Sequence, residues 1–318
     1  MIAVLGLGSI GLRHARNLLS LGVRVIGYDP SEERRSMLAA EGGLPAVHRD
    51  EALAAATAAV IASPSGRHFD DMRAGLDAGC HLFVEKPLAH TTEGLAALLD
   101  QADESGKVVA VGFNLRHHPA VLQAQRAIRE GHLGRPLWAR LELADYLPHW
   151  RPGTDFRQGY ANDPKTGGVI FDIVHEFDLA AFLLGVPEVK ACVAAHTGTL
   201  GLESEDLADM VLVHPGGAQS LVHVDFVSRP RRRHTLVYGT EAAMHLDLDA
   251  RKLSIVRGDG VPLAEHQFPG AYADDYLDEM TSFLACCRGE AQPSCPGREA
   301  LDVLDRLITA RRIAGLPS

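Results

Sequence analysis

The sequence lacks the features of membrane-spanning, secreted and disulfide-bonded proteins. No apolar run approaches the ~20 residues that a helix needs to cross a bilayer. The apolar start MIAVLGLGSIGL has no basic segment and is interrupted by glycines, unlike a signal peptide. The 5 cysteines are odd in number and none is spaced as CxxC, which favours reduced thiols. We therefore expect a cytoplasmic protein.

Positive charge is also scarce. The chain has 31 Lys and Arg against 41 Asp and Glu, a formal net charge of -10. This charge opposes binding to a phosphate backbone or to an anionic membrane surface. Neither nucleic acid nor a membrane is therefore expected as a partner.

One basic cluster runs against this trend. The segment SRPRRRHT stands between two strand-like runs and contains Arg229, Arg231, Arg232 and Arg233. Two interpretations stay open for it. The first is a solvated hairpin or a subunit contact, and the second is an anion-binding site.

Repeats, low-complexity tracts and metal-site patterns are missing as well. His117 and His118 have no HxxxH or HExxH partner, so no metal site is expected. The chain has 318 residues, of which 46% are hydrophobic and 23% charged, as in an average globular protein. This length favours two domains, each with its own core.

The first part of the chain alternates between strand and helix patterns. Strands are expected at 2–5, 23–29, 58–63, 81–85 and 108–113, and helices at 12–21, 31–42, 67–78 and 91–105, with a further short helix before the third strand. Apolar strands that alternate with helices predict a parallel sheet covered on both faces. We assign residues 1–115 to a Rossmann dinucleotide-binding domain.

The segment GLGSIG follows the first strand and opens the first helix. In this context Gly6 permits the tight turn, Gly8 lets the backbone approach a pyrophosphate, and Gly11 lets the helix pack closely on the strand. Asp29 ends the second strand, where a carboxylate binds the adenosine ribose and repels a 2′-phosphate. This favours NAD, although Arg34 and Arg35 nearby leave NADP open as the less favoured cofactor.

Further candidates lie where later strands end, because ligands of open parallel sheets bind beyond the carboxyl ends of the strands. The segment FVEKPLAH ends the fourth strand, and Lys86 follows it directly. From spacing alone, this segment is either a strand-end ion pair stopped by a proline or part of a site. The predicted cofactor-binding residues are Gly6, Gly8, Ser9, Ile10, Gly11, Asp29, Ser63, Pro64, His68 and Glu85.

Three motifs together suggest a family. GLGSIGLRHARNL, EKPLA and GGVIFDIVHEFDLAAFLLG, in this order and separation, resemble the oxidoreductases named after glucose-fructose oxidoreductase, inositol 2-dehydrogenase and a rhizopine-catabolism protein (Gfo/Idh/MocA). The resemblance covers nearly the whole chain. It implies that Lys86 is the active-site lysine and that Pro87 shapes the loop presenting it to the nicotinamide.

The second part of the chain has a different pattern. A helix at 120–131 precedes long runs of period two without helices between them, which predict a mainly antiparallel sheet with one covered face. We assign residues 116–318 to an α+β domain with a large open sheet. Two closing helices, at 272–288 and 297–314, are expected to pack back against the body. The resemblance implies that the open face makes subunit contacts, hence a homodimer or homotetramer.

A carboxylate and an imidazole stand together in FDIVHEFDL, at the start of an expected helix. At positions i and i+3, Asp172 and His175 share one face, so the carboxylate can hold the imidazole tautomer. The alternative is a capping Asp with a core histidine, and the resemblance favours the catalytic pair. Many relatives space the pair as DxxxH, however, which puts the role of Asp172 in doubt. Asp178 keeps the usual HxxD spacing and is expected to be structural.

These residues predict a hydride-transfer mechanism. His175 has an ordinary pKa near working pH and is the expected base that removes the substrate hydroxyl proton. Lys86 would hydrogen-bond the same oxygen and stabilise the negative charge that develops there.

Polar and aromatic residues beyond the first domain are candidates for binding the substrate. Aromatic faces with fixed polar groups suit a sugar ring, and arginines suit a sugar acid or a nucleotide-linked sugar. A long loop tied to its own acidic surface is the alternative. The predicted substrate-binding residues are Arg116, His117, Tyr146, Trp150, Arg151, Arg157 and Tyr160.

The function that this pattern favours is an NAD(P)-dependent dehydrogenase acting on a hydroxyl of a sugar, cyclitol or sugar acid. Two alternatives of the same fold remain, a glycosidase that retains and recycles NAD and a redox-silent regulator that senses a sugar or dinucleotide. The presence of Lys86 and His175 argues against the regulator but does not separate the two enzymes.

Overall fold

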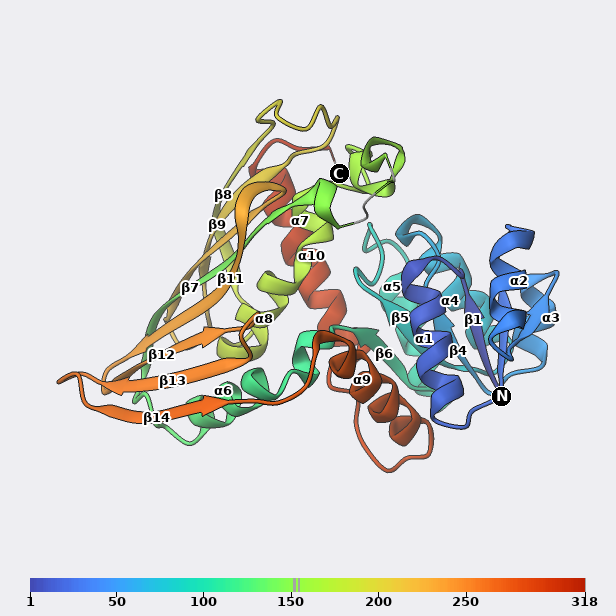
Figure 1. The fold of residues 1–318 in the computed structure, drawn as a ribbon, viewed down its shortest axis with the longest axis horizontal. Coiled ribbons are helices and arrows are strands. Elements are labelled where there is room, and N and C mark those ends of the chain that lie inside the picture. Colours follow the sequence, from blue (N-terminus) through green and yellow to red (C-terminus); the bar gives the residue numbers. More distant parts are fainter. Residues whose placement is uncertain (151–152, 154, 318) are drawn as a thin grey trace. The chain divides into compact units, whose positions relative to one another are not determined.

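The computed structural model describes residues 1–150, 153 and 155–317. The chain divides into two compact units, shown in Figure 1. The first unit contains Met1–His117 and Ala271–Leu304, and the second contains His118–Gly270 and Asp305–Ser318. Residues 271–304 thus belong to the first unit although they follow most of the second along the chain.

The first unit is built on a six-stranded sheet in which every pairing is parallel. Its order, β3-β2-β1-β4-β5-β6, is that of doubly wound dinucleotide-binding sheets. The strands are β1 (Ile2–Leu5), β2 (Val25–Tyr28), β3 (Leu44–Ala46), β4 (Ala58–Ile61), β5 (His81–Glu85) and β6 (Val109–Gly112). All five predicted strands are confirmed, and β3 is an additional short edge strand.

Helices connect these strands and cover the sheet. They are α1 (Ser9–Ser20), α2 (Glu32–Ala40), α3 (Arg49–Ala54), α4 (His68–Asp77), α5 (Leu95–Glu104) and α9 (Tyr272–Cys287), with short 3-10 turns η1 (Ser65–Arg67) and η2 (Asn114–His117). Ser31 caps α2 by accepting a hydrogen bond from the Arg34 amide. Every residue of β1 and β4 is buried, which explains why these strands are apolar along their whole length.

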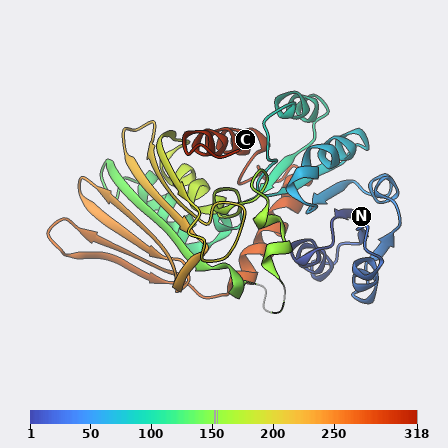
Figure 2. The same cartoon turned by 90° about the horizontal axis from the view of Figure 1, so that it is seen from above.

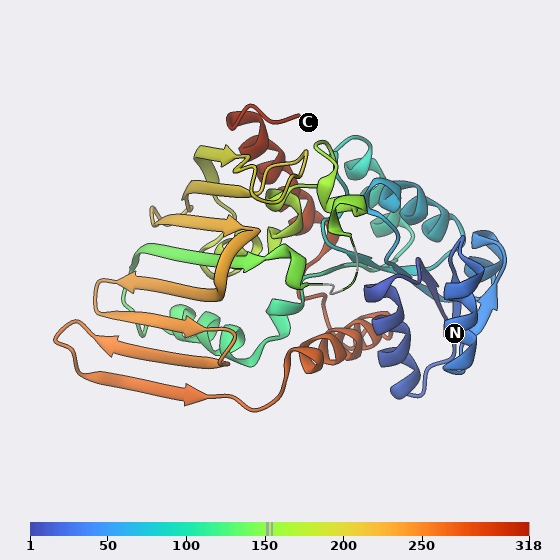
Figure 3. The same ribbon diagram turned by 45° about the horizontal axis from the view of Figure 1, so that its top comes forward.

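The second unit is built on an eight-stranded sheet, with its strands side by side in Figure 3. Its order is β14-β13-β12-β11-β7-β10-β9-β8, and β7 with β10 is its parallel pair. The strands are β7 (Pro136–Tyr146), β8 (Glu188–Ala195), β9 (Leu207–Val213), β10 (Gln219–Asp225), β11 (Val227–Gly239), β12 (Ala242–Asp247), β13 (Lys252–Arg257) and β14 (Pro262–Gln267). The predicted mainly antiparallel sheet is confirmed, and β12 to β14 are strands that the sequence pattern did not predict.

Helices cover one face of this sheet (Figure 2). α6 (Pro119–Arg129) contacts β12 and β13, and α8 (Val174–Leu184) contacts β7 and β10. Along β7, Ala139 and Leu141 are buried while Trp138 and Arg140 are exposed, the alternation of a sheet with one solvated face. On the exposed face the Trp138 ring stacks on Tyr238 of β11, with ring centroids 4.4 Å apart.

The remaining elements of the second unit are short apart from one long helix. They are η3 (Leu147–His149), η4 (Phe156–Gln158), η5 (Tyr160–Asn162), α7 (Val169–Asp172) and α10 (Gly297–Ile313), whose first residues belong to the first unit. Among the helices that the structure describes, none is both long and apolar enough to cross a bilayer.

Candidate functional site

The glycine loop between β1 and α1 has the geometry of a pyrophosphate site. Gly6 has a φ of +87° and donates its N–H to Tyr28 O at 2.8 Å, a conformation that favours glycine. A Cβ at Gly11 would lie 1.8 Å from Gly6 O, so helix and loop are in direct backbone contact there. A Cβ at Gly8 would meet nothing within 4 Å. The loop therefore leaves open space beside the amino end of α1, where Ser9 and Ile10 begin the helix.

Asp29 is held at the end of β2 by the glycine loop. Its buried carboxylate accepts hydrogen bonds from Leu7 N at 2.8 Å and Ser31 N at 2.9 Å. The Arg34 guanidinium lies 3.4 Å from the same carboxylate, and Arg35 donates to Asp29 O at 2.6 Å. Both arginines thus bind Asp29, which ties the acidic residue and the glycine loop into one substructure.

His68 connects the loops that follow β4 and β5. Its Nε2 lies 2.8 Å from Ser63 O and its Nδ1 lies 3.0 Å from Pro87 O. Burial lowers the pKa of His68, although both carbonyl oxygens favour the protonated ring. The Ser63 hydroxyl donates to Asp71 at 2.7 Å, and Pro64 precedes η1. The two loops at the carboxyl ends of neighbouring strands are therefore fixed to each other.

Glu85 and Lys86 form the end of β5 and the turn after it. The Glu85 side chain is buried, with its Oε1 2.6 Å from His14 Nε2 on α1. Its Oε2 accepts the Lys86 amide N–H at 3.1 Å. Lys86 is half-buried and is joined to Pro87 by a cis peptide bond. The Glu85 carboxylate thus binds α1 and the backbone of the residue that follows it.

Arg116 and His117 lie in η2 of the first unit. The buried Arg116 guanidinium donates to Ser294 O at 2.6 Å and pairs with Glu299 at 2.8 Å. His117 Nε2 lies 2.9 Å from the Ser294 hydroxyl. Burial and the charge of Arg116 lower the pKa of His117 to about 4, so its ring is neutral at neutral pH. These contacts hold η2 to Ser294, before α10, and to Glu299 in the first turn of α10.

Asp172 and His175 do not stand on one continuous helix. Asp172 ends α7 and His175 belongs to α8, with Ile173 between them at φ -96° and ψ 41°, outside the helical region. The prediction of a shared i, i+3 helical face is therefore wrong. The buried Asp172 accepts a hydrogen bond from the Tyr160 hydroxyl at 2.8 Å. His175 is half-buried, and Asp178 is buried within α8.

The aromatic residues at the end of β7 and in the loop after it contact acidic and basic side chains. Trp150 Nε1 donates to Asp145 at 2.9 Å. Arg157 Nε donates to Leu200 O at 3.1 Å. Arg229 lies over the Tyr146 ring, 4.3 Å from its centroid. Arg151 lies outside the described residues.

The basic cluster occupies strand β11 itself, so its prediction as a hairpin between strands is wrong. Arg231 pairs with Asp145 and Asp249. Arg233 is buried and its Nε donates to Glu176 at 2.7 Å. Arg229 is exposed at the start of the strand and stacks on an aromatic ring instead. The sequence left the whole cluster open as an anion-binding site but did not single out Arg229, because its aromatic partner is 83 positions away along the chain.

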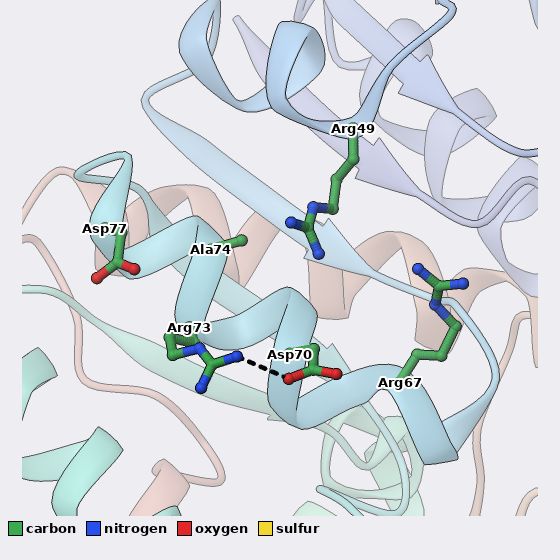
Figure 4. Close-up of a pocket in the computed structure, with 6 residues that line it drawn as sticks. All are labelled: Arg49, Arg67, Asp70, Arg73, Ala74 and Asp77. Carbon is green, nitrogen blue, oxygen red and sulfur yellow. Dashed lines mark hydrogen bonds and ion pairs between the residues drawn. The ribbon is translucent and has the colours of Figure 1, made fainter.

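A separate cavity of about 350 Å³ lies on the surface of the first unit (Figure 4). Its six lining residues come from α3, η1 and α4, and Arg73 pairs with Asp70 at 2.9 Å along α4. Four of the six side chains are exposed, and the lining contains none of the predicted site residues. We interpret it as a solvated charged depression between helices.

Comparison with known families assigns both parts of the chain. Residues 1–113 match a model described as an oxidoreductase family with an NAD-binding Rossmann fold. Residues 121–245 match the C-terminal domain of the same family, GFO/IDH/MocA. The chain belongs to the GFO/IDH/MocA oxidoreductase family. The resemblance carried by the three sequence motifs is thereby confirmed.

Relatives of this GFO/IDH/MocA protein are named as dehydrogenases and reductases. It is 29% identical to 1,5-anhydro-D-fructose reductase of Ensifer adhaerens over 77% of this chain and 73% of the relative. It is 32% identical to scyllo-inositol 2-dehydrogenase (NAD(+)) of Bacillus subtilis over 58% of this chain and 53% of that one. A structure of levoglucosan dehydrogenase with NADH and levoglucosan matches 99% of this chain and 96% of its own, at a TM-score of 0.87 and 19% identity. The last likeness bears on the fold alone.

NAD fits the first unit of this family member. The positive φ of Gly6, the space at Gly8 and the close contact at Gly11 are the three features that the phosphate loop needs. Asp29 stands at the end of β2, where the adenosine ribose is bound in such folds. The predicted cofactor is confirmed as NAD by the family assignment.

Proposed function

We propose that this GFO/IDH/MocA protein is an NAD-dependent dehydrogenase acting on a secondary hydroxyl group of a sugar or cyclitol. The observation that carries the proposal is the match of both family domains, at 1–113 and 121–245, to a chain that keeps Lys86 and His175. Relatives named for 1,5-anhydro-D-fructose and scyllo-inositol support a polyhydroxylated substrate.

The chemistry divides between two side chains of this protein and its cofactor. Bound NAD supplies the nicotinamide carbon that accepts the hydride from the carbinol carbon. His175 removes the hydroxyl proton, since an imidazole titrates near neutral pH. Lys86 donates a hydrogen bond to the same oxygen and stabilises the negative charge that develops there. Tyr160 and Asp172, joined at 2.8 Å, hold the loop that precedes His175.

We further propose that the substrate carries a carboxylate group. Arg229 is exposed, has no carboxylate partner among the described residues and is stacked on Tyr146. A guanidinium held on an aromatic face is pre-oriented and can form two parallel hydrogen bonds to a carboxylate. Arg157, by contrast, donates to Leu200 O and lies 3.6 Å from Asp155. We therefore assign recognition of a sugar acid to Arg229.

Turnover of NAD with a panel of pyranoses, inositols and sugar acids tests the main proposal. A dehydrogenase forms one NADH for each product, whereas a glycosidase that recycles its cofactor forms product without net NADH. Lys86→Ala and His175→Gln should each lower kcat by at least ~100-fold, while the exposed controls Lys190→Ala and His132→Gln should not. Product formation without NADH, or full activity of Lys86→Ala, would refute it.

The substrate charge is tested with one further variant. Arg229→Gln should raise KM for sugar acids by ~10-fold or more, as expected for a lost charge-assisted hydrogen bond, and leave neutral sugars unchanged. Arg257→Gln, an exposed arginine of β13, is the matched control. An equal effect of Arg229→Gln on neutral and acidic substrates would contradict the sugar-acid assignment.

We also propose that the exposed face of the eight-stranded sheet joins copies of this chain into a dimer or tetramer. The Trp138 and Tyr238 rings stack on the exposed face, and Leu221 of β10 and Val193 of β8 are exposed elsewhere on the sheet. Large exposed apolar groups on one sheet face favour a protein contact. Light scattering of the wild type and of Trp138→Glu should show an oligomer that the substitution dissociates, and a wild-type monomer would refute the proposal.

A further inference from the structure

Three titratable side chains of the first unit meet in its interior. His14 of α1, Glu85 of β5 and Glu279 of α9 are 0%, 7% and 2% exposed. One nitrogen or oxygen atom from each lies within 4.8 Å of the other two. Phe83 and Tyr276 pack edge-on against the His14 ring, with centroids 5.2 and 6.0 Å away. The cluster is thus enclosed by aromatic side chains.

The two carboxyl groups of this cluster differ in their partners. Glu85 accepts hydrogen bonds at both oxygens, one from His14 at 2.6 Å and one from the Lys86 amide at 3.1 Å. Each oxygen of the Glu85 carboxyl group thus has a polar partner. Both oxygens of Glu279 lack a hydrogen-bond partner among the described residues.

Glu279 is the carboxyl group of the cluster whose pKa is shifted by its surroundings. Burial raises the pKa of Glu279 well above its usual range, and the negative charges of Glu85 and Asp275 raise it further. The raised pKa favours the neutral form of Glu279 over its charged form. The hydrogen bond between His14 Nε2 and Glu85 Oε1 is short, at 2.6 Å. The cluster therefore holds one well-defined, strongly bonded carboxylate.

The turn that carries Lys86 is held on both sides. On one side Glu85 binds the Lys86 amide and is itself anchored to α1 through His14. On the other side His68 lies 3.0 Å from Pro87 O. The backbone on either side of Lys86 is thus bonded to two buried side chains. One is Glu85 of β5, which is itself bonded to His14 of α1, and the other is His68 of α4.

We propose that Glu85 is a positioning residue for Lys86: its carboxylate, anchored by His14, fixes the backbone of the turn from which the lysine acts. The role rests on the proposed function of Lys86 in hydride transfer. It assigns Glu85 no contact with substrate. A misplacement of about 1 Å at a reacting group can lower the rate ~100-fold, which gives the interaction a measurable effect.

Substitutions at both ends of the hydrogen bond test the proposal. Glu85→Ala should lower kcat by ~10- to 100-fold, with the Kd of NAD within about twofold of wild type. Glu85→Gln is isosteric and its amide oxygen still accepts the Lys86 N–H, so it should lose less than Glu85→Ala. His14→Gln retains a side-chain N–H donor and should recover activity relative to His14→Ala. Glu104→Gln, an exposed carboxyl of the first unit, is the matched control.

A readout independent of turnover separates this proposal from the proposed function. The His14 Nε2–H proton should give a strongly downfield NMR signal that persists in the inactive Lys86→Ala and disappears in Glu85→Gln. The rate at which an amine-reactive reagent labels Lys86 should also change in Glu85→Ala. If no polyol is oxidised, the proposed function fails while these two signals still support the positioning role.

Three results would overturn the positioning role. The first is wild-type kcat in Glu85→Ala. The second is a loss of NAD binding in proportion to the loss of activity, which would make Glu85 a cofactor ligand. The third is unchanged labelling of Lys86 together with no His14 signal in the wild-type protein. Because Glu85→Gln keeps the size and shape of the side chain, it reports on the interaction even if Glu85→Ala does not fold.

Discussion

Two glycines of one loop should respond to the same substitution in opposite ways. An Ala at position 11 would place its Cβ 1.8 Å from Gly6 O and 2.9 Å from Gly6 C, well inside van der Waals contact. The obstacle is backbone, so either the loop or α1 must shift. An Ala at position 8 would meet nothing within 4 Å, and the φ of -69° there suits any residue.

The expected magnitudes follow from these distances. Overpacking commonly costs about 1–3 kcal/mol, and Gly11→Ala should reach or exceed about 3 kcal/mol because no side chain can rotate away. Gly8→Ala should leave the free energy of unfolding within about 0.5 kcal/mol of wild type, or raise it slightly because alanine lowers the conformational entropy of the unfolded chain. Its methyl group would occupy the approach of the pyrophosphate, however, and weaken NAD binding by ~10-fold or more, about 1.4 kcal/mol.

Two measurements on the same preparations test these expected effects on stability and on NAD affinity. Urea denaturation monitored by circular dichroism gives the stability of each variant, and quenching of tryptophan fluorescence by NAD gives its affinity. Gly22→Ala is the control that separates backbone strain from a steric clash. The glycine has a φ of +76°, but a Cβ there would meet nothing within 4 Å. A Gly8→Ala protein that binds NAD as tightly as the wild type would refute the placement of the pyrophosphate at this loop.

Three further predictions concern the second unit. Arg311 and Glu205 form a buried ion pair at 2.8 Å, so Glu205→Ala should cost about 3–5 kcal/mol in urea denaturation, and the smaller effect of Glu290→Ala on the surface is the comparison. The pKa of His223 is raised to about 9 by its hydrogen bond to Asp225 and by the charge of Asp209, although burial lowers it. The stability that the protonated ring confers is complete below the pKa of His223 in the unfolded chain and is lost as pH rises through about 9. Between about pH 6 and about pH 10, the urea midpoint of the wild type should therefore fall by more than that of His223→Gln. Tyr160→Phe removes the donor to the carboxylate that ends α7 and should lower kcat by ~10-fold without changing NAD affinity, and equal kcat values would contradict its role.

Local patterns were sufficient to predict the sheet of the first unit. Its strands are short, apolar and bounded by glycines or polar residues, because both faces are covered and the chain reverses at the surface. β3 was not predictable, since its three residues LPA include a proline and its first two are exposed. The sequences of strands β12 to β14 do not alternate regularly between apolar and polar residues. These strands lie at one edge of their sheet, where contacts with neighbouring side chains rather than intrinsic strand propensity decide the structure.

The contacts within the candidate site were less predictable than its residue types. The sequence places Glu85 at a strand end but cannot show that its partner is His14, 71 positions away. Likewise, Arg233 reads as one of several solvated arginines until its strand brings it to Glu176, 57 positions away. Such pairings depend on the tertiary fold. A signal was present for His14, which stands three residues after Gly11 and so faces the sheet with it.

The break at Ile173 separates Asp172 from His175. An uninterrupted helix would put residues three apart on one face, but here α7 ends at Asp172 and α8 begins at Val174. The apolar run VIFDIV has no proline or glycine to mark the break. Because the two residues lie on different helices, their relative position depends on Ile173 rather than on helical periodicity, and Asp172 is oriented by the Tyr160 hydroxyl. His175 therefore lies in α8, whereas Asp172 at the end of α7 is bonded to Tyr160 of η5.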